Sequence, residues 1–229
     1  MNYISIIMST FNSEQHVGKS IDSILNQTFE DFEFLILDDG STDNTQEVVK
    51  NYSKSDKRIK FYKNDVNLGL TLSLNTLIQN ASGNIIARQD SDDISRKNRI
   101  EMQINFLKEN NLDACTSFAV SQQTLKKINN LKSYLPLNLV IKYRNPFIHG
   151  SLILKKKVLN EIGNYDERFK YAQDYKLMTD LIKSNYKVKI LKEVLYELNT
   201  ENNISTNKKN EQAYYANCVR RSIDPLLKN

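Results

Sequence analysis

The sequence is poor in cysteine and contains no long apolar run. Its two cysteines, Cys115 and Cys218, are far apart and do not have the spacing of metal ligands. This argues against a disulfide scaffold or a zinc knuckle and indicates a reducing compartment. The N-terminus lacks a basic region followed by an apolar stretch, and no later segment reaches the ~18 apolar residues of a membrane span. The sequence therefore predicts a cytoplasmic protein, either soluble or peripheral at the inner face of the cell membrane.

The composition is that of a folded domain with a mild positive charge. The 229 residues are 40% hydrophobic and 26% charged, which suits the core of one α/β domain. The formal net charge of +5 favours anionic partners, among them nucleotide phosphates, nucleic acid and acidic lipid headgroups. Nucleic acid is the weakest of these, because the basic residues are not interleaved with aromatic residues on one face.

The first hundred residues alternate between short apolar runs and segments of helical periodicity. The expected strands are 4–8, 32–37, 59–62 and 85–87, and the expected helices are 17–25, 45–52 and 70–78. Regular alternation with short connections predicts a mostly parallel, doubly wound central sheet flanked by helices. In such sheets ligands bind at the carboxyl ends of the strands.

The second half of the chain has a weaker pattern. Its expected elements are a helix over 100–107, strands over 114–120 and 151–154, a short helix from 156, a helix opening at 174, an edge strand at 186–190 and a last helix over 211–223. Residues 121–144 are expected to be irregular, and residues 199–210 to form a flexible linker.

An acidic cluster follows the fourth expected strand. Asp90, Asp92 and Asp93 lie within four residues, and carboxylates this close repel one another unless a cation binds. Mg²⁺ or Mn²⁺ takes one or two carboxylates and leaves its other positions to water and substrate phosphates. The alternative is a solvated acidic turn that caps the next helix. We favour the metal site, because a second acidic cluster also lies at a strand end.

That second cluster is Asp38-Asp39-Gly40-Ser41-Thr42-Asp43, after the second expected strand. Such residues are ordinary in turns and N-caps, and Thr42 or Asp43 is expected to cap the next helix. Two adjacent acids are more than capping requires. A carboxylate here can accept a hydrogen bond from the imide N–H of uracil or thymine, or touch a ribose hydroxyl.

Several motifs together resemble glycosyltransferase family 2. They are Ile6-Ile7-Met8-Ser9-Thr10-Phe11-Asn12, Gln27-Thr28-Phe29, Leu37-Asp38-Asp39-Gly40-Ser41-Thr42-Asp43, Asn67-Leu68-Gly69, and Asp90-Ser91-Asp92-Asp93 with Arg99. They cover residues 3–107 in the family's order and spacing. The second half resembles the family more loosely, through His149, Gly163-Asn164-Tyr165-Asp166-Glu167 and Ala172-Gln173-Asp174-Tyr175.

The resemblance implies the GT-A fold and the organisation of the chain. A GT-A domain over residues 1–198 would bind the nucleotide-sugar with residues 1–107 and the acceptor with residues 108–198. Residues 199–229 would form the linker and the C-terminal helix. The resemblance also implies Mn²⁺ or Mg²⁺ as cofactor and transfer with inversion, in the synthesis of capsule, lipopolysaccharide or another surface glycan.

The resemblance assigns the donor pocket to four residues. Ser9, Thr10 and Phe11 would lie beside the base and the ribose, and Asp39 would pair with the base. UDP is the favoured nucleotide because an acid at Asp39 suits uracil, although dTDP offers the same hydrogen bond. Phe11 replaces the usual tyrosine and keeps a ring for stacking.

The resemblance assigns the chemistry to four carboxylates. Asp92 would contact the metal and the diphosphate, and Asp90 and Asp93 would assist through hydroxyl groups and metal-bound water. Asp174 matches the catalytic base, where a helix N-terminus favours the charged carboxylate. The alternative for Asp174 is a plain N-cap aspartate. Gln173 replaces the common glutamate before it.

Other polar residues have two readings each. His149 either contacts the acceptor or diphosphate, or is a buried, hydrogen-bonded histidine. Arg99 pairs with a phosphate or with Asp93. Lys176 and Asp180 depart from the family's pattern on the base helix, which leaves the acceptor side open.

The basic clusters 155–157, 208–209 and 220–221 are ordinary solvated surface, or hold the protein at an anionic membrane where lipid-linked glycan acceptors reside. The last helix suits either docking onto the domain, which we favour, or the membrane.

Two rival functions follow from the same residues. A sugar nucleotidyltransferase also binds a nucleotide diphosphate through a metal, but residues 9–12 contain none of the glycines of a phosphate loop. A non-catalytic nucleotide- or sugar-binding relative is consistent with Gln173. The intact Asp90–Asp93 cluster and Asp174 favour the enzyme.

Overall fold

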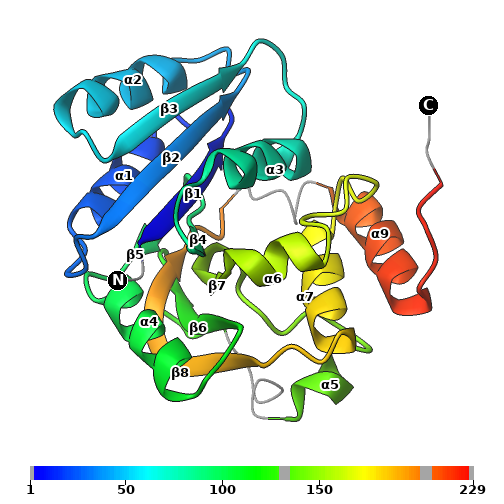
Figure 1. The fold of residues 1–229 in the computed structure, drawn as a ribbon. Helices are drawn as coiled ribbons and strands as arrows, with labels where there is room; N and C mark the ends of the chain where they lie inside the picture. Colours follow the sequence, from blue (N-terminus) through cyan, green and yellow to red (C-terminus); the bar gives the residue numbers. More distant parts are fainter. Residues whose placement is uncertain (1–2, 129–134, 202–207, 227–229) are drawn as a thin grey trace.

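The computed structural model describes residues 3–128, 135–201 and 208–226, and the structural statements below concern these residues. An eight-stranded sheet in the order β3-β2-β1-β4-β7-β6-β8-β5 carries helices on both faces (Figure 1). The strands are β1 (Ile4–Thr10), β2 (Phe32–Asp39), β3 (Ile59–Asn64), β4 (Ile85–Arg88), β5 (Ile94–Ser95), β6 (Ala114–Ser121), β7 (Ile153–Lys155) and β8 (Val188–Leu198). The helices are α1 (Val17–Leu25), α2 (Thr45–Ser55), α3 (Leu70–Asn80), α4 (Arg99–Glu109), α5 (Leu137–Val140), α6 (Lys156–Glu161), α7 (Gln173–Lys183) and α9 (Lys209–Arg221), with a 3₁₀ turn η2 (His149–Ser151).

The sheet is mostly parallel, as the sequence predicts. Strand β1 is parallel to β2 and β4, and β2 is parallel to β3. Strand β7 runs antiparallel to both β4 and β6, and so joins the two halves of the sheet. Strand β8 is parallel to β6. The predicted α/β fold is therefore confirmed.

Two hydrophobic clusters fill the space on either side of the sheet. Ile4, Ile6 and Met8 of β1 pack with α1 and α4, whereas Ile7 faces the side that holds α3, α6 and α7. This alternation follows from the period of two in a strand, and it works on both faces because a doubly wound sheet is buried on both. Helix α3 and helix α6 cross the same face in Figure 1.

The second half differs from the sequence prediction in two elements. Strand β8 continues to Leu198, and it pairs with β5 at Tyr196 and Glu197, so only its first, lysine-bearing part is an edge. The short helix α5 lies within the segment predicted to be irregular. Part of that segment, residues 129–134, and half of the predicted linker, residues 202–207, lie outside the described residues.

The C-terminal helix α9 docks onto the domain. Cys218 and Val219 are buried in the cluster that also holds α7. The ring of Tyr215 packs edge-on against Phe169, with 6.0 Å between the ring centroids. The sequence left open whether the last helix docks onto the domain or onto the membrane. In the described residues, the helix face with Cys218 and Val219 docks onto the domain.

A buried carboxylate ties the amino ends of the central strands together. Glu33 of β2 accepts hydrogen bonds from Ser5 (2.5 Å) and Ser82 (2.6 Å) and pairs with Lys60 (2.5 Å). Burial alone would raise the pKa of Glu33, but hydrogen bonds from Lys60, Ser5 and Ser82 lower it to about 2. The charged form is therefore the one that the fold stabilises.

We expect Glu33→Gln to destabilise the protein at neutral pH and to flatten its acid unfolding. Because the folded pKa lies below the unfolded value, this stabilisation is complete above about pH 4.5 and is lost as the pH falls toward 2. The shift corresponds to roughly 3 kcal/mol. Urea unfolding at several pH values measures the free energy of unfolding of both proteins. If this free energy fell as steeply between pH 5 and about pH 3 in the variant as in the wild type, the assignment would be contradicted.

Candidate active site

The carboxyl ends of the parallel strands bring the two acidic clusters to one edge of the sheet. Strand β1 lies between β2 and β4, and Thr10 at its end is opposite Asp38. Asp39 is opposite Asn64 of β3. The loop with Asp92 follows β4 on the other side of β1. The two clusters therefore flank the end of β1, which is the arrangement that the sequence predicts for a shared ligand.

Asp39 is held by the turn that follows β3. It is 2% exposed, and its carboxylate accepts hydrogen bonds from Asn64 Nδ2 (2.7 Å) and from the backbone N–H of Leu68 (3.0 Å) and Gly69 (2.8 Å). Gly40 makes this packing possible, since a Cβ there would lie 2.6 Å from the carbonyl carbon of Val66. Asp39 thus positions the turn, a role that the sequence did not reveal.

Unpaired polar atoms and exposed apolar side chains lie together at this edge. Thr10 Oγ1 and Asp38 Oδ1 are buried and have no hydrogen-bond partner within the described residues. Phe11 and Leu68 are 46% and 49% exposed. Ser9, just before them, is half-buried. Buried polar groups are nearly always paired, so these atoms indicate that a ligand or water completes the edge.

The three carboxylates after β4 have different surroundings. Asp90 pairs with the fully buried guanidinium of Arg88. Asp93 is 2% exposed, and its Oδ1 accepts a hydrogen bond of 2.7 Å from Asn199 N. Asp93 is therefore turned into the protein, and its predicted assisting role stays a prediction. Asp92 is left half-buried at the surface.

Tyr196 of β8 holds the acidic loop from beneath. Its hydroxyl accepts a 3.1 Å hydrogen bond from Asp90 N and donates a hydrogen bond to the Asp93 carboxylate. Gly150 packs against both partners, because a Cβ there would clash with the Tyr196 hydroxyl and lie 2.6 Å from Asp90 Oδ2. Sequence reasoning missed Tyr196 and Gly150, since neither lies in a recognisable motif.

Arg99 belongs to the same support. It is fully buried, donates to the Arg88 carbonyl (3.1 Å) and lies over the Tyr196 ring at 5.4 Å from the centroid. Burial lowers the pKa of Arg99 to about 10. The described ion pairs include none with Asp93. Arg99 therefore lies under the loop, and its predicted contact with a phosphate stays a prediction.

The surroundings of Asp92 fit a divalent ion that arrives with a diphosphate. Burial, and then the charge of Asp90, raise the pKa of Asp92 to about 6, so a nearby cation would stabilise its charged form. The described residues contain no group of three His, Cys, Asp or Glu side chains that could hold an ion by themselves. Two carboxylates, water and substrate phosphates are the usual Mg²⁺ set. Asp92 and Asp90 can supply the protein's part.

On the acceptor side, Asp174 lies in the first turn of α7 and is half-buried. Asn145 Nδ2 donates to its Oδ2 at 2.7 Å. Burial raises the pKa of Asp174 above the ordinary 3.8, while hydrogen bonds from Tyr175 N and Asn145 oppose the rise. A carboxylate that is raised but still hydrogen-bonded suits a general base. The residue at the N-cap is Ala172, so Asp174 is not a plain N-cap.

His149 forms a partly buried pair with Tyr165. Its Nε2 lies 2.7 Å from the Tyr165 hydroxyl, and the rings meet edge-on. Burial, and then Arg88, hold the pKa of His149 well below 6.5, so the imidazole is neutral. The structure thus agrees with the hydrogen-bonded alternative for His149.

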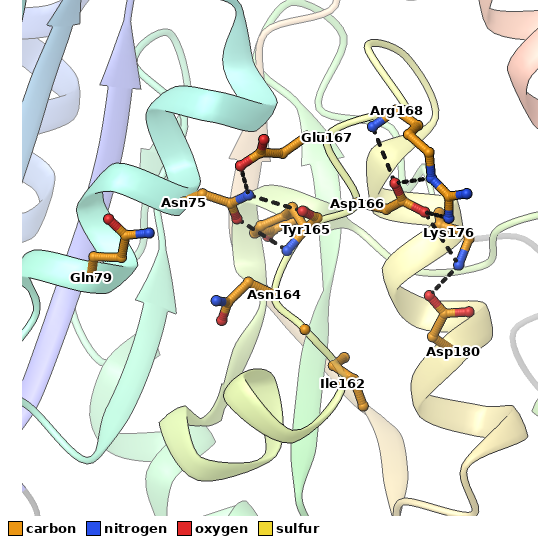
Figure 2. A pocket seen from close by; sticks show the side chains of 11 residues that line it. Asn75, Gln79, Ile162, Asn164, Tyr165, Asp166, Glu167, Arg168, Lys176 and Asp180 are labelled. Carbon is orange, nitrogen blue, oxygen red and sulfur yellow. Dashed lines mark hydrogen bonds and ion pairs between the residues drawn. The ribbon is translucent and has the colours of Figure 1, made fainter. Parts of the chain in front are cut away.

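A polar pocket of about 520 Å³ opens between α3, the 162–168 loop and α7 (Figure 2). Lys176 pairs there with Asp180 at 2.6 Å and with Asp166 at 3.8 Å. Because successive helical residues are 100° apart, Lys176 and Asp174 point to opposite sides of α7. The pocket shares no lining residue with the acidic edge.

We expect Asp92→Asn to stabilise the metal-free protein at neutral pH. Between about pH 4 and pH 6 the folded state keeps a proton that the unfolded chain has released, so the free energy of unfolding falls as the pH rises through this window. The variant should melt a few degrees above the wild type at pH 7.5 and level with it below about pH 4. Asp65→Asn, whose side chain is 93% exposed, is the control. An equal shift in both variants would contradict the prediction.

The comparisons with known proteins agree with this geometry. Residues 5–165 match glycosyl transferase family 2. The chain is 31% identical to the O-antigen biosynthesis glycosyltransferase WbnJ of Escherichia coli, over 100% of this chain and 90% of WbnJ. It is 33% identical to the E. coli enzyme named UDP-Glc:alpha-D-GlcNAc-diphosphoundecaprenol beta-1,3-glucosyltransferase WfgD, over 80% of this chain and 70% of WfgD.

The fold is similar to that of a solved glycosyltransferase. The mannosyltransferase PcManGT of Pyrobaculum calidifontis, solved with GDP-Man and Mn²⁺, superposes with a TM-score of 0.76 over 97% of this chain and 65% of that chain, at 18% identity. The architecture is therefore that of GT-A glycosyltransferases. With the family match over most of its length, the chain belongs to glycosyltransferase family 2.

Proposed function

We propose that the protein transfers a sugar from a UDP-sugar to a hydroxyl of a lipid-linked glycan, with inversion and with Mn²⁺ or Mg²⁺, in the synthesis of a surface glycan. The observation that carries this proposal is the position of Asp92, a half-buried carboxylate of raised pKa beside the end of β1. The names of WbnJ and WfgD support the pathway, the UDP donor and the lipid-linked acceptor. The Mn²⁺ of PcManGT supports the metal.

The donor nucleotide lies at the ends of β1 and β2 in this proposal. The exposed ring of Phe11 stacks on the base, and Leu68 covers its other side. The unpaired Oδ1 of Asp38 accepts a hydrogen bond from the nucleoside, and the unpaired hydroxyl group of Thr10 donates one to it. Asp39 keeps the Leu68–Gly69 turn in place and has a remaining lone pair for the imide of uracil or thymine.

Asp92 and Asp90 hold the divalent ion together with the donor diphosphate. When bound, the ion neutralises the charge that develops on the leaving phosphate. Asp90 is oriented for this by Arg88 and Tyr196, and Asp93 anchors the loop from within. Residues 1–107 thus bind the donor, residues 108–198 the acceptor, and Tyr196 joins the two parts.

Asp174 takes the proton of the attacking acceptor hydroxyl. The acceptor oxygen forms a bond to the anomeric carbon as the bond from that carbon to the phosphate oxygen breaks, which inverts the configuration. Asn145 orients the carboxylate through its 2.7 Å hydrogen bond. Gln173 is 8% exposed and carries no charge, so a single carboxylate serves as the base.

Donor binding is tested by thermal shift with a panel of nucleotide-sugars, with and without Mn²⁺. We expect stabilisation by UDP-sugars only when the ion is present, and its loss in Asp92→Ala. Saturation at 100 times the dissociation constant corresponds to about 2.7 kcal/mol of added stability. Asp65→Asn serves as the control. Metal-independent stabilisation, or full turnover of Asp92→Ala with EDTA, would refute the metal assignment.

Catalysis is tested by Asp174→Asn and Asn145→Ala. The first should keep the donor thermal shift and reduce turnover by about 10²–10⁴, the range for loss of a general base. The second removes a hydrogen bond that lowers the pKa of Asp174, so the acidic limb of the pH–rate profile should move to higher pH. A protein that binds donor yet shows no turnover in any form would be a non-catalytic relative.

A further inference from the structure

The basic clusters of the sequence differ in their surroundings. Lysines of the first two clusters lie in ion pairs with acidic neighbours: Lys155–Asp113, Lys157–Glu161 and Lys208–Glu211, with N···O distances of 2.9, 3.6 and 3.5 Å. Arg220 and Arg221 at the end of α9 are exposed, and none of the ion pairs among the described residues includes either of them. Within that part of the chain, the arginine cluster is the one of the three without any member in an ion pair.

The segment around α5 exposes an apolar face. Val140 and Ile141 are buried, whereas Leu139 and Tyr143 are 53% and 75% exposed. The backbone continues in turns to Arg144, so Leu139 and Tyr143 lie about one turn apart on the same outward side. A helical turn that exposes large apolar residues opposite its buried ones has a second apolar surface to cover.

This face adjoins the end of α9. Arg220 Nη1 donates to the Tyr143 carbonyl at 3.4 Å, and Figure 1 shows α5 and the end of α9 on either side of α7. The exposed bases Lys142 and Arg144 lie beside Tyr143. We call Leu139, Lys142, Tyr143, Arg144, Arg220 and Arg221 the α5–α9 surface. No acidic residue occurs in 135–144 or in 212–223.

We infer that the α5–α9 surface docks onto a membrane that contains anionic phospholipid. Four bases that have no acidic partner among the described residues complement the negative headgroups, and each is worth ~1 kcal/mol near such a surface. Leucine and tyrosine side chains suit the boundary between headgroups and acyl chains, where the apolar part enters and the hydroxyl stays hydrated. The mixture of exposed apolar and basic groups, without acids, matches this occupant.

The α5–α9 surface is also tied to the proposed base. The Tyr175 hydroxyl donates a hydrogen bond to the Ile141 carbonyl at 2.6 Å, and Asn145 Nδ2 donates one to the Asp174 carboxylate. The middle of the segment, at Ile141, and its end, at Asn145, are thus fixed to the first turn of α7. Membrane docking would bring Asp174 close to sugars carried on lipid; this part of the inference rests on the proposed function.

Co-sedimentation with vesicles tests the inference. The vesicles are phosphatidylcholine alone and an equal mixture of phosphatidylcholine and phosphatidylglycerol. We expect binding to the mixture only, weakened by salt. Arg220→Gln/Arg221→Gln should weaken binding about 30-fold, the equivalent of two ~1 kcal/mol contributions. Leu139→Ser/Tyr143→Ser should weaken the part that persists at high salt.

Lys208→Gln/Lys209→Gln is the matched control, because it removes the same charge from the other end of α9. Equal binding to both vesicles, or an equal loss in the control, would overturn the inference. So would a dimer in mass photometry that Arg220→Gln/Arg221→Gln dissociates, since a second copy would then cover the surface. The donor thermal shift with Mn²⁺, measured on the same variants, should be unchanged. If the wild type shows the donor thermal shift but does not bind vesicles, the inference is wrong and the proposed function stands. If the wild type binds the anionic vesicles but shows no donor thermal shift, the proposed function is wrong and the inference of membrane docking stands.

Discussion

The mutual repulsion of Asp90, Asp92 and Asp93 is the constraint around which the site is built. In a partly buried loop this repulsion is stronger than in water, because the effective dielectric constant is lower. The protein relieves it by giving Asp90 a buried arginine and by turning Asp93 into backbone and tyrosine hydrogen bonds. These contacts relieve the repulsion only in part. Burial, and then the charge of Asp90, still raise the pKa of both Asp92 and Asp93.

The relief of this repulsion depends on parts of the chain that are distant in sequence. Tyr196 and Asn199 reach the loop across 106 residues, by way of β8 and its pairing with β5. The donor edge is therefore completed by the second half of the protein. At the same edge, Asp43 Oδ1 accepts a hydrogen bond of 3.0 Å from Thr45 N at the start of α2, so the second acidic cluster also caps this helix.

The sequence was sufficient for the first four strands, the helices between them and the acidic edge, because these rest on local patterns. Apolar runs and helical spacing fix the first four strands, and parallel strands bring Asp38 and Asp92 to the same edge. The supporting residues could not be predicted in this way. The roles of Tyr196, of Gly150 and of the turn held by Asp39 depend on contacts between distant segments. The burial of Arg99 could not be predicted either, because nothing in the sequence distinguishes a buried arginine from an exposed one.

The glycine at position 150 has a consequence for how such enzymes can be rebuilt. Its missing Cβ lets the backbone before β7 touch both the Asp90 carboxylate and the Tyr196 hydroxyl. The two halves of the chain therefore contact each other directly at the acidic loop and are not structurally independent. A chimera that exchanges everything after residue 107 for the corresponding part of another family member would import a new neighbour for Asp90. It would keep the present arrangement of the acidic loop only if the grafted part brought its own matching glycine and tyrosine.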